Sequence, residues 1–157
     1  MANTYTQIYI HIVFAVKNRL SLIKPECEVE LYRYIAGACK SRHHHLRAIG
    51  GDKDHIHMLV SMNPAESISA LVQSIKIQTS KWMHEHFHIP DFAWQSGFGA
   101  FSYSQAFLPQ VETYILNQKD HHKKVTFEQE MRMIYQKAGI DYDERYMLMG
   151  YERMSDT

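Results

Sequence analysis

The chain has 157 residues, a length that suits one domain with its own hydrophobic core. Its 17 Lys and Arg balance its 17 Asp and Glu, which argues against a general polyanion binder. No stretch approaches the roughly 18 apolar residues of a membrane span, and the N-terminus lacks the features of a secretory signal. We therefore expect a cytoplasmic protein with no membrane partner and with reduced cysteines at Cys27 and Cys39.

Apolar periodicity predicts a strand, a helix and two further strands in the first half of the chain. β-Branched and aromatic residues favour the strands, and apolar residues three and four apart after Pro25 favour the helix. Gly and Asp in residues 50–54 predict a turn between the second and third strands. The expected elements are a strand over 5–16, a helix over 25–42, and strands over 46–49 and 56–62.

The second half predicts one more strand and three helices. Ser67 can cap a long helix, and Gly97 and Gly99 indicate a bulge or a close backbone approach in the last strand. Pro109 suits the first turn of the next helix, and Gly139 suits the C-terminal cap of the last. The expected elements are a helix from 67 to about 86, a strand over 92–103, a helix from 109 closed by residues 120–124, and a helix over 127–138.

This order of elements indicates an α+β fold of the ferredoxin-like, split βαβ type. We expect an antiparallel sheet with helices on one face and extra helices at the C-terminal end. The first and third strands lie centrally in such a sheet. The third would hold His55 and His57 on a rigid element near the middle of the molecule.

Four residues carry the chemistry. His55 and His57 are one residue apart in a predicted strand and therefore point to the same face. Tyr114 and Gln118 are four apart in a predicted helix and also share a face. Two imidazoles and an oxygen ligand can hold a divalent ion, and a phenol becomes a useful nucleophile when a metal or base activates it. Together they suggest covalent phosphoryl chemistry, although a lone His-x-His is often only structural.

Four segments, taken in order, make the chain resemble a known family. They are Val13-Phe-Ala-Val-Lys-Asn-Arg19, Gly50-Gly-Asp-Lys-Asp-His-Ile-His-Met-Leu-Val60, Trp94-Gln-Ser-Gly-Phe98 and Val111-Glu-Thr-Tyr-Ile-Leu-Asn-Gln-Lys-Asp-His-His122. The chain is similar over roughly residues 5–125 to the single-tyrosine HUH transposases of small insertion sequences. This includes the type associated with repeated extragenic palindromes (REP).

The resemblance implies a transposase that cleaves and rejoins single-stranded DNA at hairpin-bearing element ends. By that similarity His55, His57 and Gln118 are metal ligands, and Tyr114 attacks the DNA to form a 5′-phosphotyrosine. The implied metal is Mg²⁺ or Mn²⁺, and no nucleotide cofactor is expected. Imidazole ligands by themselves favour softer ions than Mg²⁺, so the identity of the metal rests on the resemblance.

The resemblance also bears on domain organisation and assembly. Residues 1–125 would form the HUH tyrosine transposase catalytic domain, and residues 126–157 would add a C-terminal helix and tail to the same domain. Family members commonly form homodimers in which the tyrosine helix of one subunit completes the histidine site of the other. The similarity of residues 126–150 to tails of REP-associated relatives suggests instead a monomer whose tail packs over its own site. Both arrangements stay open.

Other polar residues near these motifs have predicted roles outside the metal site. Basic residues beside the first strand and the tyrosine helix are candidates for DNA contacts. They are Lys17, Arg19, Lys119, His121, His122 and Lys123. Asp52 and Asp54 could orient an imidazole, but a role as turn residues is favoured. The run His43-His44-His45 is interpreted as solvated surface.

Three other classes of protein were weighed. A non-catalytic or domesticated single-stranded nucleic-acid-binding protein could use the same sheet, but it needs neither His-x-His nor Tyr-x-x-x-Gln. A histidine-triad nucleotide hydrolase would need a third alternating histidine at position 59, which is Leu59. A zinc-dependent hydrolase lacks support, because no His-Glu-x-x-His or Cys-x-x-Cys pattern occurs.

Overall fold

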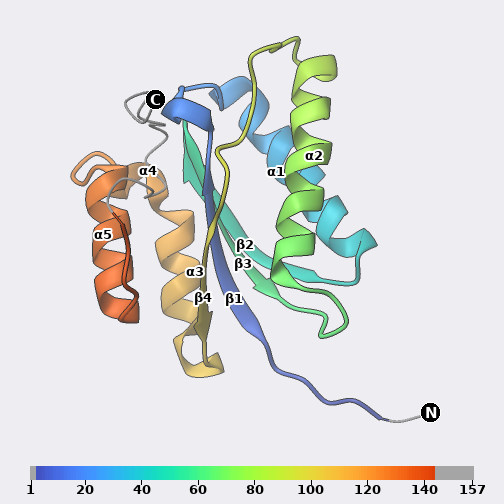
Figure 1. Cartoon of the computed structure of the whole chain (residues 1–157), viewed down its shortest axis with the longest axis vertical. Coiled ribbons are helices and arrows are strands. Elements are labelled where there is room, and N and C mark those ends of the chain that lie inside the picture. The colour runs from blue at the N-terminus through green and yellow to red at the C-terminus, as the bar shows by residue number, and fades with distance from the viewer. Residues whose placement is uncertain (1–2, 144–157) are drawn as a thin grey trace.

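The computed structural model describes residues 3–143 (Figure 1). No helix in this part of the chain is both long and apolar enough to cross a membrane. The strands are β1 (Tyr9–Ala15), β2 (His45–Asp52), β3 (His55–Ser61) and β4 (Gly99–Tyr103). The helices are α1 (Pro25–Ser41), α2 (Ile68–His86), α3 (Leu108–Leu116), α4 (Gln118–His121) and α5 (Phe127–Ala138), with single 3-10 turns at Lys17–Arg19 and Gln105–Phe107.

The four strands form one antiparallel sheet in the order β2-β3-β1-β4. This order confirms the ferredoxin-like α+β prediction, with β1 and β3 in the centre. In the register of the two central strands, His57 lies opposite Val13 and His55 opposite Ala15. The His-x-His pair therefore lies on an interior strand, where hydrogen bonds to neighbours on both sides restrict its backbone.

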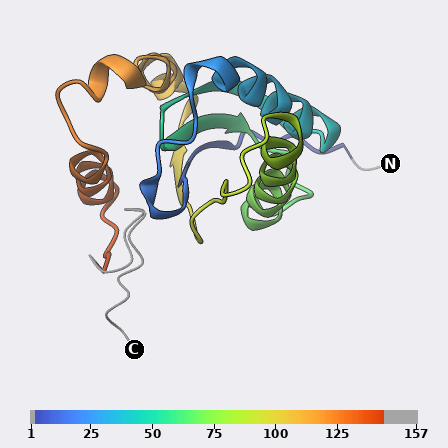
Figure 2. The same cartoon turned by 90° about the horizontal axis from the view of Figure 1, so that it is seen from above.

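Helices cover both faces of the sheet. Alternate residues of β1 separate the two cores: Ile12 and Phe14 pack with α1 and α2, whereas Val13 and Ala15 pack with α5. A third cluster joins α3 to β2 and β3. Figure 1 shows α1 and α2 on one side of the sheet with α3 and α5 on the other, and Figure 2 shows the chain passing from α4 to α5 along that second side. The extra C-terminal helices thus enclose the face that carries His55 and His57.

The turn between β2 and β3 is shorter than predicted. Only Lys53 and Asp54 lie between the strands, so Gly50 and Gly51 belong to β2 rather than to a loop. The close approach of α3 explains Gly50, because a Cβ there would lie 2.0 Å from the carbonyl oxygen of Ile115. Gly50 therefore serves packing between strand and helix, whereas a Cβ at Gly51 would lie 2.2 Å from the carbonyl oxygen of His55 in the neighbouring strand. Sequence pattern alone does not distinguish these roles from turn formation.

Two other predicted elements are shorter or broken. The last strand begins at Gly99 instead of residue 92, with one isolated bridge between Val16 and Trp94 before it. The predicted tyrosine helix is divided into α3 and α4, because Asn117 departs from helical geometry at φ −97° and ψ 19°. As a result, Tyr114 lies before the break and Gln118 directly after it.

The last helix, α5, has strong signals at both ends. Thr126 and Gln129 form a reciprocal capping box at its start, and Gly139 ends it in the left-handed region at φ 66°. The predicted bounds of 127–138 are confirmed. This helix packs on the sheet face that carries the histidine pair, while the predicted tail from residue 144 onward lies outside the described residues.

Candidate active site

His55 and His57 occupy the buried centre of the site, each with no exposed surface. The Nδ1 of His55 lies 2.8 Å from the Asp54 carboxylate, which also accepts a hydrogen bond from Arg19 at 3.2 Å. The Nε2 atom of His55 faces Gln118 instead. Asp54 lies in the turn before β3, and its side chain orients the imidazole of His55. The sequence pattern favoured a role in the turn alone.

Another histidine, His11, holds the ring of His57 in place. The Nδ1 of His57 lies 2.8 Å from Nε2 of His11, and the two rings stack with centroids 5.0 Å apart. Burial lowers the pKa of His57 to about 4, although the Glu130 carboxylate opposes this shift. Burial also lowers the pKa of His11 to about 3, assisted by His57. Both imidazoles are therefore neutral near pH 7, which is the form that binds metal ions.

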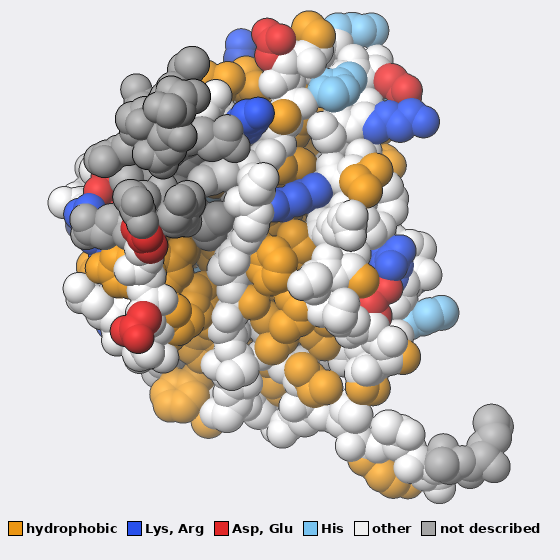
Figure 3. Space-filling view, viewed as in Figure 1, with side chains coloured by type: hydrophobic (Ala, Val, Ile, Leu, Met, Phe, Trp, Pro, Cys, Tyr) orange, Lys and Arg blue, Asp and Glu red, His pale blue; other side chains and the backbone are white. Residues whose placement is uncertain are grey.

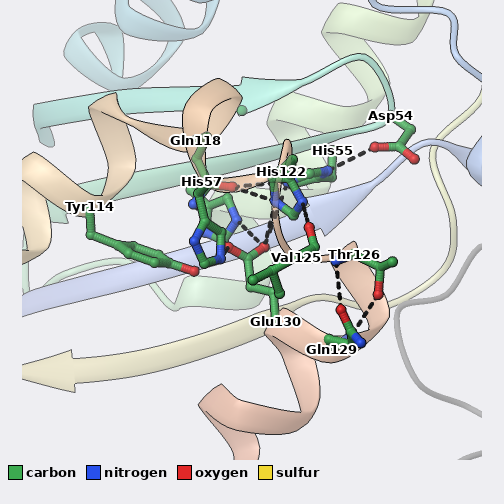
Figure 4. Close-up of polar contacts among 12 residues, drawn as sticks. Asp54, His55, His57, Tyr114, Gln118, His122, Val125, Thr126, Gln129 and Glu130 are labelled. Atoms are coloured by element: carbon green, nitrogen blue, oxygen red, sulfur yellow. Dashed lines mark hydrogen bonds and ion pairs between the residues drawn. The ribbon is translucent and has the colours of Figure 1, made fainter.

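Tyr114 and Gln118 reach the same place from the broken helix (Figure 4). The Oε1 atom of Gln118 lies 3.1 Å from Nε2 of His55, and this amide is almost completely buried. The Tyr114 ring meets the ring of His57 edge-on at 5.8 Å, and its hydroxyl donates a hydrogen bond to Glu130. All four predicted residues are thus brought together within one chain.

Glu130 and His122 complete the cluster, and neither was predicted as a metal ligand. Glu130 of α5 is only 1% exposed, and its Oε1 lies 3.0 Å from Nε2 of His57 and 3.1 Å from Nε2 of His122. Its Oε2 accepts hydrogen bonds from Tyr114 and, at 2.9 Å, from Gln118. A signal for Glu130 existed in the sequence, because a charged residue between Phe127 and Met131 interrupts the apolar face of a helix.

Neighbouring side chains stabilise the negative charge on the Glu130 carboxylate. Burial opposes ionisation, but hydrogen bonds from His122 and His57 outweigh it and place the pKa of Glu130 well below the ordinary range. For Tyr114, burial and the adjacent Glu130 carboxylate both raise the phenol pKa far above its ordinary value. In this arrangement the carboxylate is ionised and the phenol retains its proton.

These residues fit a divalent metal ion. One ligand atom from each of His55, His57, His122 and Glu130 lies within 4.8 Å of the other three, and the side chains point to a common centre (Figure 4). Neutral imidazoles and a carboxylate are suitable ligands for Mn²⁺ or Zn²⁺, and the Gln118 amide oxygen adds one more donor close by. The predicted metal site therefore has more donors than the sequence motifs supplied.

The predicted DNA contacts lie in different environments. Lys17 is exposed, and Lys123 is exposed beside Asp120. Lys119 pairs with Glu28 at 2.6 Å. Arg19 pairs with Asp54 and lies over the Phe127 ring. His121 is partly exposed, and its Nε2 lies 3.2 Å from Glu130. The His122 side chain is only 6% exposed. Lys17, Lys119 and Lys123 are exposed, while His122 belongs to the buried cluster.

One predicted surface histidine is also buried. His44 is 4% exposed, with Nε2 2.9 Å from Glu66 and Nδ1 accepting a hydrogen bond from the backbone N–H of Asn63. Arg42 binds the same carboxylate through Nε at 2.8 Å. The surface interpretation of His44 is wrong, because this residue joins the end of α1 to the loop before α2. The next residue, His45, pairs with Ser61, at the other end of β3 from His55.

A separate groove lies on the opposite side of the sheet. Its volume is about 840 Å³, and it runs between α2 and residues 93–98. Figure 3 shows hydrophobic side chains gathered along this strip. Lys76 crosses it and donates hydrogen bonds to the carbonyls of Gln95 and Gly97, while burial lowers its pKa to about 8. None of the predicted site residues lines this groove.

The sequence matches a family model described as transposase IS200 like over residues 4–118. That range covers most of the chain and includes His55, His57, Tyr114 and Gln118. The chain belongs to the IS200-like transposase family. The resemblance found in the sequence motifs is therefore confirmed. No curated protein matches the chain at a significant level.

Solved structures agree with this IS200-like fold. A Deinococcus radiodurans protein described as a transposase has a TM-score of 0.60 at 21% identity, covering 75% of this chain and 96% of its own. A REP-associated tyrosine transposase bound to a REP hairpin has a TM-score of 0.59 at 16% identity, covering 80% of this chain and 74% of its own. At these identities the likeness concerns the fold.

The IS200-like match ends at Gln118, before the rest of the cluster. His121, His122 and Glu130 all lie C-terminal to the matched residues. Helix α5, which supplies Glu130, therefore contributes to the buried site from outside the segment that defines the family here.

Proposed function

We propose that this IS200-like transposase cleaves and rejoins single-stranded DNA at hairpin-bearing element ends through a 5′-phosphotyrosine intermediate. Tyr114 is the nucleophile, and His55, His57 and Gln118 hold Mg²⁺ or Mn²⁺. One observation carries the proposal: the Tyr114 hydroxyl and Nε2 of His57 contact the two oxygens of a single buried carboxylate. A phenol held this close to a group of metal-binding atoms is arranged for attack on a bound phosphodiester.

The proposed reaction conserves the number of phosphodiester bonds. The Tyr114 oxygen attacks the scissile phosphorus and loses its proton, while the 3′ oxygen of the DNA leaves as a hydroxyl. A second 3′-hydroxyl then attacks the phosphotyrosine, which restores the phenol and joins the new strands. A divalent ion bound by the imidazoles would neutralise charge on the phosphate during both displacements. No nucleotide cofactor is required because the protein–DNA bond stores the energy.

The proposed partner is single-stranded DNA with a hairpin. The fold likeness to a transposase bound to a REP hairpin supports this choice, as do the exposed cations Lys17 and Lys123. We further propose that each chain forms its own site, although the family resemblance implied a homodimer. Tyr114 and His57 of one chain already touch the same carboxylate, so a partner is not needed to bring them together. We also propose that the protein acts on DNA in the cytoplasm.

The test is to trap the covalent adduct. Single-stranded DNA from the flanks of the gene, labelled at the 5′ or the 3′ end, is incubated with Mg²⁺ or Mn²⁺ and analysed on a denaturing gel. We expect a metal-dependent adduct on the 3′ fragment for the wild type and none for Tyr114→Phe. Tyr103→Phe is the matched control, because its ring lies near His11 on the same face and it should retain the adduct. Hairpin binding without any wild-type adduct would instead favour the non-catalytic or domesticated binding protein.

A further inference from the structure

The two oxygens of Glu130 contact different parts of the site. Oε1 faces imidazole nitrogens, 3.0 Å from His57 and 3.1 Å from His122. Oε2 accepts hydrogen bonds from the Tyr114 hydroxyl and the Gln118 amide. A single carboxylate therefore joins the atoms that can bind a metal ion to the residue that can attack DNA.

Burial of this carboxylate requires a specific explanation. A carboxylate that is 1% exposed is costly unless cations or hydrogen-bond donors compensate for it. Its neighbours on α5, Phe127 and Met131, are apolar and pack against the sheet. Its hydrogen bonds come from four residues of the candidate site, His57, His122, Tyr114 and Gln118. In addition, Nε2 of His121 lies 3.2 Å from its Oε2. A role limited to anchoring α5 would not need an anion at this position, because an apolar residue would pack with Phe127 and Met131.

The donor set also bears on which ion is preferred. Imidazole nitrogens alone favour Zn²⁺ and other softer ions, whereas Mg²⁺ and Mn²⁺ prefer carboxylate and amide oxygens. With His55, His57 and Gln118 only, the site would have a single oxygen donor from the protein. Glu130 adds an anionic oxygen within 3.7 Å of Nε2 of His55 as well as beside His57.

We propose that Glu130 is a ligand of the divalent ion, that it raises the affinity of the site for Mn²⁺ and Mg²⁺ more than for Zn²⁺, and that its second oxygen holds Tyr114 beside that ion. This inference rests on the proposed function and deepens it. It makes α5, which lies beyond the family match at residues 4–118, a part of the catalytic machinery. In this chain the site depends on a residue that is twelve positions after the last of its motif ligands, Gln118.

The experiment measures binding of Mn²⁺ and of Zn²⁺ to the full-length, metal-free protein by calorimetry, in the absence of DNA. Glu130→Gln keeps the shape of the side chain but removes its charge. We expect its affinity for Mn²⁺ to fall by roughly tenfold or more and its affinity for Zn²⁺ to fall by less than about threefold. The matched control is Glu128→Gln, which removes the same charge from the same helix at a position that pairs with Arg132. It should bind both ions like the wild type.

Other outcomes separate this inference from the proposed function. Wild-type affinity for Mn²⁺ in Glu130→Gln would overturn the ligand role, and an equal loss for the two ions would overturn the role in metal preference. Failure of the wild type to bind either ion would instead remove the metal site on which the proposed function depends. If Glu130→Gln does not fold, a wild-type crystal soaked with Mn²⁺ decides the matter. A Glu130 oxygen within about 2.3 Å of the anomalous peak is expected, and a peak without that contact would refute the role.

Discussion

The hydroxyl of Tyr114 on α3 donates a hydrogen bond to the carboxylate of Glu130 on α5, sixteen residues further along the chain. This bond connects the candidate nucleophile to a helix that begins after the end of the family match. The position of Glu130 in turn depends on how firmly α5 is held at its N-terminus, where the Thr126 hydroxyl accepts a hydrogen bond from the backbone N–H of Gln129.

Removing that cap should loosen α5. We expect Thr126→Ala to lower the free energy of unfolding by about 1 kcal/mol, because the backbone amide of Gln129 loses the hydroxyl that accepts its hydrogen bond. Amide hydrogen exchange in residues 127–131 should become faster, which mass spectrometry can measure. Thr126→Ser retains the hydroxyl and should restore wild-type exchange, and a Ser variant that behaved like Ala would contradict the capping explanation.

His11 should matter for metal binding although it is not a ligand in the proposed site. Its Nε2 lies 2.8 Å from Nδ1 of His57, and among the described residues its own Nδ1 has no hydrogen-bond partner. We expect His11→Leu to weaken Mn²⁺ binding by roughly tenfold to a hundredfold, because His57 loses the group that orients its ring. His11→Gln keeps a polar group at this position and should recover most of the affinity in calorimetry. Equal affinities for Leu and wild type would rule out the orienting role.

Gly50 should be intolerant of a side chain. An added Cβ would meet the backbone carbonyl of Ile115, the residue after Tyr114, so Gly50→Ala must push α3 away from the sheet. We expect a loss of about 1–3 kcal/mol in the free energy of unfolding, measured by urea denaturation, together with reduced DNA cleavage.

A second glycine provides the matched control for that substitution. A Cβ at Gly37, inside α1, has no neighbour within 4 Å. Gly37→Ala should therefore raise the free energy of unfolding by about 0.5–1 kcal/mol through helix propensity alone. Destabilisation by both variants to the same extent would show that the close approach of α3 is not the cause.

The cluster of Arg42, His44 and Glu66 predicts that the stability of the fold depends on pH. Hydrogen bonds from Arg42 and His44 lower the pKa of Glu66 from 4.5 to about 2. Because the folded pKa lies below the unfolded one, the unfolded state binds more protons between these values. The stabilisation is therefore complete above pH 4.5 and is lost as the pH falls toward 2.

Urea denaturation at several pH values can isolate this contribution. The wild type should be more stable than Glu66→Gln near pH 6, and the difference should shrink as the pH falls from 4.5 toward 2. Glu112→Gln, which removes only the partly exposed pair with Arg47, should change stability by less than about 1 kcal/mol at pH 6. A difference between wild type and Glu66→Gln that stayed constant with pH would contradict the assigned cause.

The sequence by itself predicted the order of the strands and helices, and it pointed to four residues that the structure brings together in the candidate site. Alternation of apolar residues and the cap at Ser67 are local features that the backbone follows directly, as the bounds of α2 and α5 show. His55 and His57 share a face because side chains alternate along a strand, so spacing alone could pair them. The spacing of Tyr114 and Gln118 paired them too, although the helix is broken at Asn117 between them.

Only the tertiary structure decided what joins these two pairs. Glu130 and His11 are distant in sequence from the motifs, and they enter the site because α5 and β1 pack against β3. Gly50 likewise looked like a turn residue until the approach of α3 showed why it lacks a side chain. Contacts of this kind depend on long-range packing geometry rather than on the conformational preference of a short segment, so a periodic pattern cannot reveal them.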